Sequence, residues 1–284
     1  MRIVIAGGTG FLGRPLAAAL TAAGHQTVAL PRDRTGWAKA IDGAAVVVNL
    51  AGESIAARRW TAAHKTRVLE SRVQVTRAIV DAIHQAASPP AVLVSGSAVG
   101  YYGPRGHEVV TEDTPAGSDF LASVCVQWEA EAARAADRSR VVCVRTGLVL
   151  ECDGGALAQM LPPFKFGVGG PVGSGRQYWP WIHRSDWIAL VQWAIATPAV
   201  AGAINATAPA PVTNAEFARA LGRALHRPAF LPAPAFALRL VLGEMADALL
   251  LSGQRAVPEK AQRLGFKFRY AQIDHALSAL FLQR

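Results

Sequence analysis

Side chains able to move a proton occur at two places in the sequence. Ser97 and Tyr101 lie four residues apart in a Gly-flanked segment, and Arg105 follows Tyr101 by four more. Because a nearby cation lowers the pKa of a phenol, this group predicts a site that polarises and protonates a substrate oxygen. The structural alternative is that Tyr101 and Tyr102 pack a turn.

The second place is His183, in the segment Trp179 to Asp186 that precedes a predicted helix. An imidazole that faces a cleft is a candidate acid or base, whereas one bonded to backbone is a structural group. Asp186 is expected to cap the helix, which would begin at Trp187. The catalytic candidates are Ser97, Tyr101 and His183, and no residue is assigned to a metal.

A glycine-rich turn joins the apolar strand predicted for residues 2–6 to the helix predicted for residues 11–23. Glycine permits a tight turn and lets backbone N–H groups approach a pyrophosphate at the positive end of a helix. Two registers of a dinucleotide fingerprint fit, Gly8-x-Gly10-x-x-Gly13 and Gly7-x-x-Gly10-x-x-Gly13. We assign the pyrophosphate to Gly7, Thr9, Gly10, Phe11, Leu12 and Gly13.

The end of the next predicted strand distinguishes the two nicotinamide dinucleotides. The chain reads Leu30-Pro31-Arg32-Asp33-Arg34 there. An acidic residue would bond the ribose 2′-hydroxyl of NAD, whereas arginine binds the 2′-phosphate of NADP. Arg32 and Arg34 favour NADP, and Asp33 supports NAD as the less favoured cofactor. A solvated loop of mixed charge is the structural alternative.

Strands and helices alternate through the first half of the chain. Apolar runs predict strands at 28–30, 46–50, 91–95 and 141–144, and helices are predicted over 65–87 and 124–136. Continuous apolar strands are typical of parallel sheets, because helices cover both faces of such sheets. The predicted fold class is α/β, a Rossmann-type doubly wound parallel sheet with a smaller C-terminal substrate lobe.

The texture changes near Gly154 to Gly- and Pro-rich loops that alternate with helices predicted over 186–196 and 214–225. We expect residues 1–153 to form the NADP-binding domain, with residues 180–208 returning to it. Residues 154–284 would form mainly the substrate lobe, at the carboxyl edge of the sheet where ligands of such folds bind.

Composition limits the partners. The chain is 51% hydrophobic and 17% charged, a composition that excludes a disordered protein. Its net charge of +9 makes an anionic partner a hypothesis to consider. The basic residues form no block or nucleic-acid-reading motif, and no apolar run is long enough to span a bilayer. We therefore expect no nucleic acid and no membrane partner. Three cysteines without a CxxC pair favour a cytoplasmic protein.

Several motifs resemble the extended short-chain dehydrogenase/reductases. Asn49-Leu50-Ala51-Gly52 matches a segment that lines the adenine-ribose side of the cofactor in that family, and Ser95-Gly96-Ser97 matches the strand and loop with its active-site serine. The resemblance implies that Asn49, Leu50, Ala51, Gly52 and Ser95 bind the cofactor. The motif set, including Leu161-Pro162-Pro163-Phe164 and a C-terminal segment from about residue 230, is most similar to its "epimerase family protein" branch.

The family's Tyr-x-x-x-Lys pair is absent from the sequence. Alignment on Glu129 places Leu121 at the tyrosine position and Cys125 at the lysine position, a loss that the similar branch shares. Neither side chain replaces a phenol and an ammonium ion. Either the proton-transfer role has moved to Tyr101, Tyr102 or His183, or the protein binds nucleotide without catalysis. The short link from 34 to 46 leaves room only for a stub of strand at 35–37.

Two functions follow as hypotheses. The first is an NADP-binding epimerase- or reductase-like enzyme that acts on a small polar substrate such as a nucleotide sugar or a carbonyl compound. The alternative is a non-catalytic NADP(H)-binding or redox-sensing protein. The oligomeric state is expected to be a monomer or a homodimer.

Overall fold

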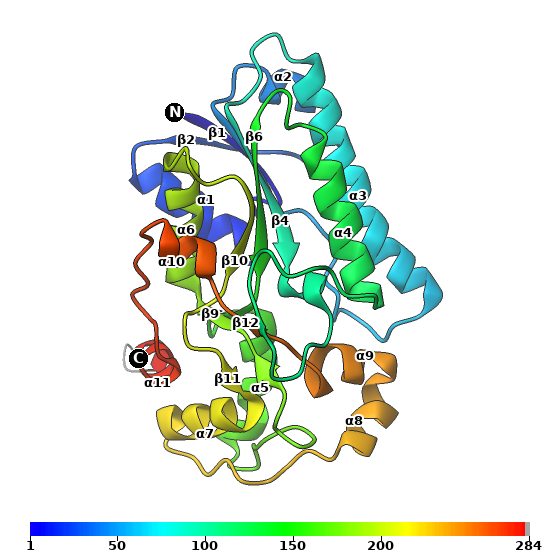
Figure 1. Cartoon of the computed structure of the whole chain (residues 1–284), viewed down its shortest axis with the longest axis vertical. Coiled ribbons are helices and arrows are strands. Elements are labelled where there is room, and N and C mark those ends of the chain that lie inside the picture. Colours follow the sequence, from blue (N-terminus) through cyan, green and yellow to red (C-terminus); the bar gives the residue numbers. More distant parts are fainter. Residues whose placement is uncertain (282–284) are drawn as a thin grey trace.

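A six-stranded parallel sheet forms the centre of the computed structural model, which describes residues 1–281 (Figure 1). The strand order is β10-β6-β4-β3-β1-β2. The first two strands form one edge of the sheet. The chain then crosses to the other side of β1, where β3, β4, β6 and β10 are added in turn up to the opposite edge. This confirms the predicted α/β, Rossmann-type fold. The strands are β1 (Arg2–Ala6), β2 (Gln26–Ala29), β3 (Val46–Asn49), β4 (Val92–Ala98), β6 (Arg140–Thr146) and β10 (Gly202–Ala206).

Helices cover both faces of this sheet, which is why its strands are almost uninterrupted apolar runs. Alternate side chains point to opposite faces, so Ile3 and Ile5 join one apolar core while Val4 and Ala6 join the other. In Figure 1, α1 and α6 lie on one side of the sheet and α3 and α4 on the other. The helices around the sheet are α1 (Gly13–Ala22), α2 (Trp37–Ile41), α3 (Ala62–Gln85), α4 (Phe120–Ala133) and α6 (Arg184–Ala196).

The link between β2 and β3 differs from its prediction. Residues 35–37 form no strand, and Trp37 instead begins α2. The Trp37 indole is buried and donates a 2.9 Å hydrogen bond from Nε1 to the carbonyl oxygen of Pro31. Burying this large ring stabilises a short helix in place of a strand. Because no strand forms in this link, β2 remains the edge strand of the sheet.

A second lobe lies at the carboxyl edge of the sheet, in the lower half of Figure 1. It has its own apolar core, to which Leu157, Trp181 and Phe217 contribute. Its elements are β7 (Leu148–Leu150), α5 (Gly155–Lys165), β8 (Tyr178–Trp179), β9 (Trp181–His183), β11 (Val212–Thr213), α7 (Asn214–Leu225), α8 (Ala235–Leu242), α9 (Glu244–Ala246), the π-helical turn η2 (Asp247–Leu251) and α11 (Ile273–Phe281). Helix α10 (Glu259–Arg263) lies instead beside α6 and contributes Ala261 to a core of the central sheet (Figure 1).

The C-terminal part of the chain returns to the loop that follows β4. Strand β12 (Arg255–Ala256) pairs in parallel with β5 (Val109–Val110), and Gln254 Nε2 donates to the carbonyl oxygen of Val99 at 2.5 Å. Val99 begins the 3-10 helix η1 (Val99–Tyr102). The second lobe therefore fixes the loop that carries Tyr101. None of the helices within residues 1–281 is long and apolar enough to cross a membrane.

Candidate functional site

The register of the parallel strands brings the predicted site residues to one edge. Ala6, at the end of β1, pairs with Asn49, and Asn49 pairs with Ser95. The Gly-rich turn, the Asn49 turn and the loop after Ser97 therefore leave the sheet at its carboxyl edge. Ligands of open α/β sheets bind at this edge.

The Gly-rich turn is shaped by backbone approaches that only glycine allows. Gly7 has φ +77°, and a Cβ there would lie 2.8 Å from the backbone of Leu50. At Gly13 a Cβ would lie 2.1 Å from the carbonyl oxygen of Gly7. In the described part of the chain, the backbone N–H groups of Phe11 and Leu12 have no hydrogen-bond acceptor. Open N–H groups at the start of α1 fit a pyrophosphate.

The second lobe packs directly on this turn. A Cβ at Gly154 or Gly155 would lie 2.7 or 2.9 Å from the Phe11 ring, so the loop before α5 is held against that ring. The guanidinium of Arg184 lies 5.4 Å from the centre of the same ring and pairs with Glu151 at 3.0 Å. No sequence pattern indicated that Gly154 and Gly155 would pack on the Gly-rich turn.

The two arginines beyond β2 are exposed. Asp33, the residue that supported NAD, accepts a hydrogen bond from the backbone N–H of Thr35 at 3.0 Å. Arg32 and Arg34 make no ion pair with any residue between 1 and 281. Both guanidinium groups are free to bind a phosphate, which fits NADP.

Asn49 and Ser95 have internal hydrogen-bond partners. Asn49 donates from Nδ2 to Thr76 Oγ1 at 2.8 Å and accepts from the Ala51 N–H at 3.2 Å. Ser95 Oγ, which is fully buried, donates to the carbonyl oxygen of Gly96 at 3.3 Å. These side chains shape the turn at 49–52 rather than present open polar atoms, so any ligand contact here would come from the backbone.

Ser97 belongs to a buried ionic network. Its Oγ donates to Glu129 Oε1 at 2.6 Å. Arg145 binds the same carboxylate with two nitrogens, Nε to Oε1 and Nη2 to Oε2, each at 2.8 Å. Glu129 comes from α4 and Arg145 from β6. Sequence reasoning used Glu129 only as an alignment anchor, and no signal identified it as the partner of Ser97.

Tyr101 is held by a cation, although not by the expected one. The Arg145 guanidinium carbon lies 3.4 Å from the centre of the Tyr101 ring. Arg105 instead donates to the backbone oxygens of Tyr102 and Pro115, because the loop turns it away. Over residues 1–281, the Tyr101 hydroxyl has no hydrogen-bond partner. Its ring is fixed while its hydroxyl stays available to a ligand.

Tyr102, the neighbouring alternative, is a structural residue. Its buried hydroxyl donates to Asn205 Oδ1 at 2.7 Å and accepts from Arg145 Nη1 at 3.0 Å. Burial raises the pKa of this phenol to about 12, against the opposing effect of Arg145. A phenol that holds its proton so tightly does not serve as a proton shuttle at neutral pH.

Leu121 and Cys125 face the loop after β4, as their alignment with the family's Tyr-x-x-x-Lys positions requires. A Cβ at Gly100 would lie 3.3 Å from that of Leu121, and Cys125 Sγ lies 3.6 Å from the carbonyl oxygen of Ala98. Burial raises the pKa of the Cys125 thiol to about 11. This neutral thiol supplies no positive charge to the site.

His183 caps a helix. Its Nδ1 accepts from the backbone N–H of Ser185 at 3.2 Å, and its ring stacks on Tyr270 with centroids 4.0 Å apart. Burial lowers the pKa of this imidazole to about 4. It makes no contact with Ser97 or Tyr101 in the described structure. The structure therefore gives His183 a structural position and brings only Ser97 and Tyr101 together.

The expected role of Asp186 as a helix cap is wrong. Helix α6 begins at Arg184, one residue after His183, so Asp186 lies within its first turn. The Asp186 carboxylate accepts from the backbone N–H groups of Arg269 and Tyr270 at 3.0 and 2.8 Å. It fixes the C-terminal segment on the second lobe.

Together, the sheet order, the glycine turn and the hydroxyl pair at the carboxyl edge define a Rossmann-type dinucleotide-binding protein. The model of the NAD dependent epimerase/dehydratase family matches residues 3–206, and a Domain of unknown function (DUF1731) matches residues 233–280. The chain belongs to the NAD dependent epimerase/dehydratase family.

Known relatives are similar over the whole chain. An "Epimerase family protein" of Mycobacterium bovis is 44% identical over 291 residues, which cover 97% of this chain and 96% of the relative. The crystal structure of human epimerase family protein SDR39U1 (isoform2) with NADPH is 36% identical, with a TM-score of 0.94 and 100% of both chains covered.

A nucleoside-diphosphate sugar epimerase from Corynebacterium glutamicum is 32% identical, with a TM-score of 0.79 over 99% of this chain and 58% of that one. These likenesses confirm the resemblance to the epimerase family protein branch.

Proposed function

We propose that this protein is an NADP(H)-binding enzyme of the epimerase or reductase type, acting on a small polar substrate. The observation that carries the proposal is the pairing of an open glycine turn with two unpaired arginines beyond β2. NADPH in the similar human structure supports this choice of cofactor. NAD is the less favoured cofactor, since the Asp33 carboxylate has a local partner.

Different residues of the chain would bind different parts of the cofactor. Backbone N–H groups of the glycine turn would bind the pyrophosphate, and Arg32 and Arg34 the 2′-phosphate. The turn after β3 and the end of β4 would line the ribose side. When bound, the nicotinamide supplies hydride transfer. The proposed cofactor residues are Gly7, Thr9, Gly10, Phe11, Leu12, Gly13, Arg32, Arg34, Asn49, Leu50, Ala51, Gly52 and Ser95.

Ser97 and Tyr101 would contact the substrate oxygen in different ways. The proton of Ser97 is directed to Glu129, so the serine oxygen offers its lone pairs to a substrate hydroxyl. The Tyr101 hydroxyl has no internal acceptor and can donate to a carbonyl oxygen. Arg145 positions both, through Glu129 on one side and the Tyr101 ring on the other.

The substrate class proposed is a nucleotide sugar or a carbonyl compound, and the name of the Corynebacterium relative supports the nucleotide sugar. A second candidate is a non-catalytic NADP(H)-binding or redox-sensing protein. The lack of the Tyr-x-x-x-Lys pair favours it, since Leu121 and the neutral Cys125 thiol stand in those positions. A cytoplasmic location and a monomeric or homodimeric state complete the proposal.

Fluorescence titration with NADPH and NADH tests cofactor choice. We expect much tighter binding of NADPH, and equal or absent binding would refute it. Catalysis is then tested by following the nicotinamide absorbance with NADPH and carbonyl compounds, and with NADP⁺ and nucleotide sugars, whose hydroxyl groups give up hydride. Ser97→Ala and Tyr101→Phe should each slow turnover without changing NADPH affinity. If the cofactor binds, but no carbonyl compound is reduced and no nucleotide sugar is oxidised or converted to its epimer, the non-catalytic candidate is supported.

A further inference from the structure

An apolar tip protrudes from the second lobe. It comprises Phe166, Phe230, Leu231, Phe236, Leu240 and Val241, which are between 45% and 83% exposed. Helix α8, which carries the last three, buries none of its side chains. Large exposed apolar patches on water-soluble proteins mark interaction surfaces.

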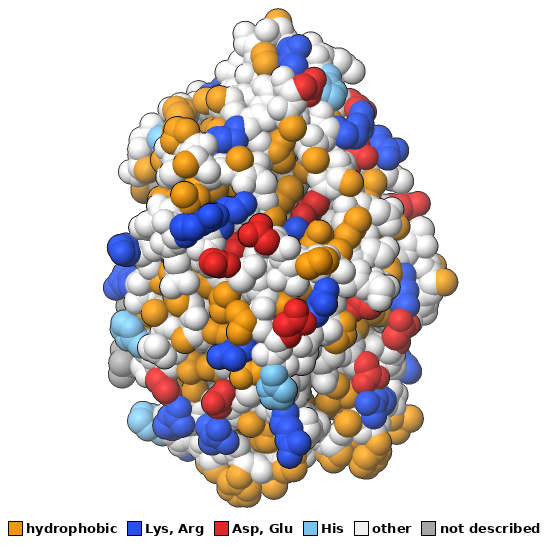
Figure 2. Space-filling view, in the orientation of Figure 1, with side chains coloured by type: hydrophobic (Ala, Val, Ile, Leu, Met, Phe, Trp, Pro, Cys, Tyr) orange, Lys and Arg blue, Asp and Glu red, His pale blue; other side chains and the backbone are white. Residues whose placement is uncertain are grey.

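Three segments of the chain contribute to this tip. The loop after α5 meets the segment after α7, where a Cβ at Gly167 would contact Pro228 at 3.6 Å and the Leu231 N–H donates to the Gly169 oxygen. The chain then passes directly into α8. Figure 1 shows the segment between α7 and α8 along the lower edge of the molecule, and orange apolar side chains gather along that edge in Figure 2.

The tip belongs to two stretches of the sequence that carry cations and no acidic residue. Residues 155–185 contain three Lys or Arg and residues 217–243 contain four, and neither stretch has any Asp or Glu. Three of these seven cations pair with acids outside the two stretches: Arg184 with Glu151 and Asp153, Arg223 with Asp274, and Arg239 with Asp247. Within the described residues, Lys165, Arg176, Arg219 and Arg227 make no ion pair.

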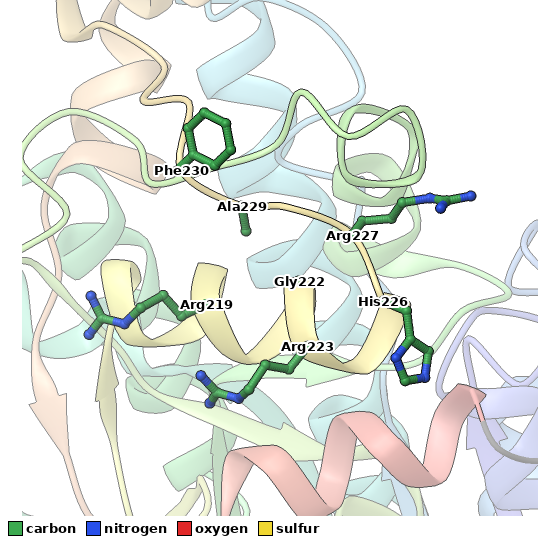
Figure 3. Close-up of a pocket in the computed structure, with 7 residues that line it drawn as sticks. All are labelled: Arg219, Gly222, Arg223, His226, Arg227, Ala229 and Phe230. Atoms are coloured by element: carbon green, nitrogen blue, oxygen red, sulfur yellow. The ribbon is translucent and has the colours of Figure 1, made fainter.

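A basic groove adjoins the tip. It has a volume of about 650 Å³, opens widely to solvent, and is lined by Arg219, Gly222, Arg223, His226, Arg227, Ala229 and Phe230. Figure 3 shows Arg219 and Arg223 extending from one side of α7, with His226 and Arg227 at the end of that helix. Phe230 stands across the groove from α7. Cationic side chains therefore border an aromatic side chain of the tip, an arrangement that fits a phosphate group joined to an apolar chain.

We propose that the apolar tip docks the protein on an anionic phospholipid bilayer. The phenylalanines and α8 enter the apolar boundary of the bilayer, while the surrounding cations meet lipid phosphates. This contact is peripheral and needs no spanning helix. It revises the sequence-based expectation of no membrane partner, which rested on the lack of a spanning segment.

A second copy of the chain is the less favourable occupant. A two-fold dimer through this face would place the same patch against itself. Lys165, Arg219 and Arg227, which have no ion-pair partner among the described residues, would then face like charges. An anionic bilayer complements both the charge and the apolar side chains.

Sedimentation with phospholipid vesicles tests the proposal on the full chain. We expect binding to vesicles of phosphatidylglycerol and phosphatidylcholine, and little binding to phosphatidylcholine alone. The double variant Phe166→Ser/Phe236→Ser should weaken binding by about tenfold or more, since each phenylalanine loses buried apolar area. Arg227→Gln should weaken it less, and added salt should weaken it further.

A matched pair of variants distinguishes binding through the tip from binding through any exposed apolar side chain. Val241→Ser lies in the tip and Val126→Ser lies on α4, and both remove an exposed valine. Only Val241→Ser should reduce vesicle binding. The proposal is wrong if anionic vesicles fail to bind the protein, or if both valine variants lose binding equally. It is also wrong if light scattering shows a dimer that Phe166→Ser/Phe236→Ser dissociates, because the face would then join two copies.

Discussion

Ser97 Oγ donates a 2.6 Å hydrogen bond to Glu129 Oε1, a carboxylate that Arg145 binds with two further hydrogen bonds. Glu129 thereby fixes the direction of the serine proton. Burial alone would lower the pKa of Arg145, but its hydrogen bonds to Glu129 hold that pKa above its usual value, so the guanidinium stays charged. The site is therefore organised by an ion pair, in place of the missing lysine of the family pattern.

Removal of Glu129 should strongly destabilise the fold. Glu129→Ala leaves Arg145, which is 5% exposed, without its carboxylate. Uncompensated buried charges of this kind cost about 3–5 kcal/mol, measurable by urea unfolding. The control is Asp81→Ala, whose partner Arg134 is 45% exposed, and which should cost less than about 1 kcal/mol. Similar losses in both variants would contradict the assignment.

The glycine turn can be tested with a matched pair. Gly7 and Gly24 have nearly the same backbone angle, φ +77° and +81°, but only Gly7 has backbone atoms within 3 Å of a Cβ. Both alanine variants meet a left-handed strain of about 1–2 kcal/mol. Only Gly7→Ala should also displace the turn at Leu50 and abolish NADPH binding, measured by fluorescence titration. Equal affinity in the two variants would show that the turn does not hold the cofactor.

The sheet could be predicted because burial on both faces leaves a simple pattern. Runs such as Val46 to Leu50 are apolar at successive positions, and the observed β3 ends at Asn49, one residue earlier. The segment 35–37 failed as a strand because the burial of Trp37 overrides its local preference.

Contacts across the sheet were harder to predict. Glu129 lies in α4, and its sequence neighbours give no indication that it reaches Ser97 on β4 or Arg145 on β6. Such a contact depends on how a helix packs against strands, and no local period encodes it. Likewise, Arg105 lies four residues beyond Tyr101, but this spacing has no meaning in a loop.

The arginines beyond β2 should determine cofactor preference. Arg32→Ala should weaken NADPH binding by about tenfold, the loss expected for one charge-assisted contact of about 1.4 kcal/mol, and leave NADH binding unchanged. Arg34→Ala should act in the same direction. The control is Lys39→Ala, an exposed cation on α2. An equal loss of NADH affinity in Arg32→Ala would argue against a contact with the 2′-phosphate.

His183 predicts how stability depends on pH. Burial lowers the pKa of its imidazole to about 4, against an ordinary value of about 6.5. Between these values the unfolded chain binds more protons than the folded one, so stability falls as pH falls. The contribution is complete above pH 6.5 and is lost progressively towards pH 4, with a maximum of about 3 kcal/mol.

An asparagine at position 183 separates this titration from helix capping. Asparagine is a good N-cap residue, so His183→Asn should keep α6 intact while removing the ionisable ring. Urea unfolding between pH 4 and 7 should then give a flatter stability profile than the parent protein. The control is His275→Asn, which alters an exposed imidazole and should keep the parent slope. If His183→Asn also keeps that slope, the buried imidazole is not the titrating group. If it flattens the slope while NADPH oxidation continues, His183 acts in the fold and not in the proton transfer.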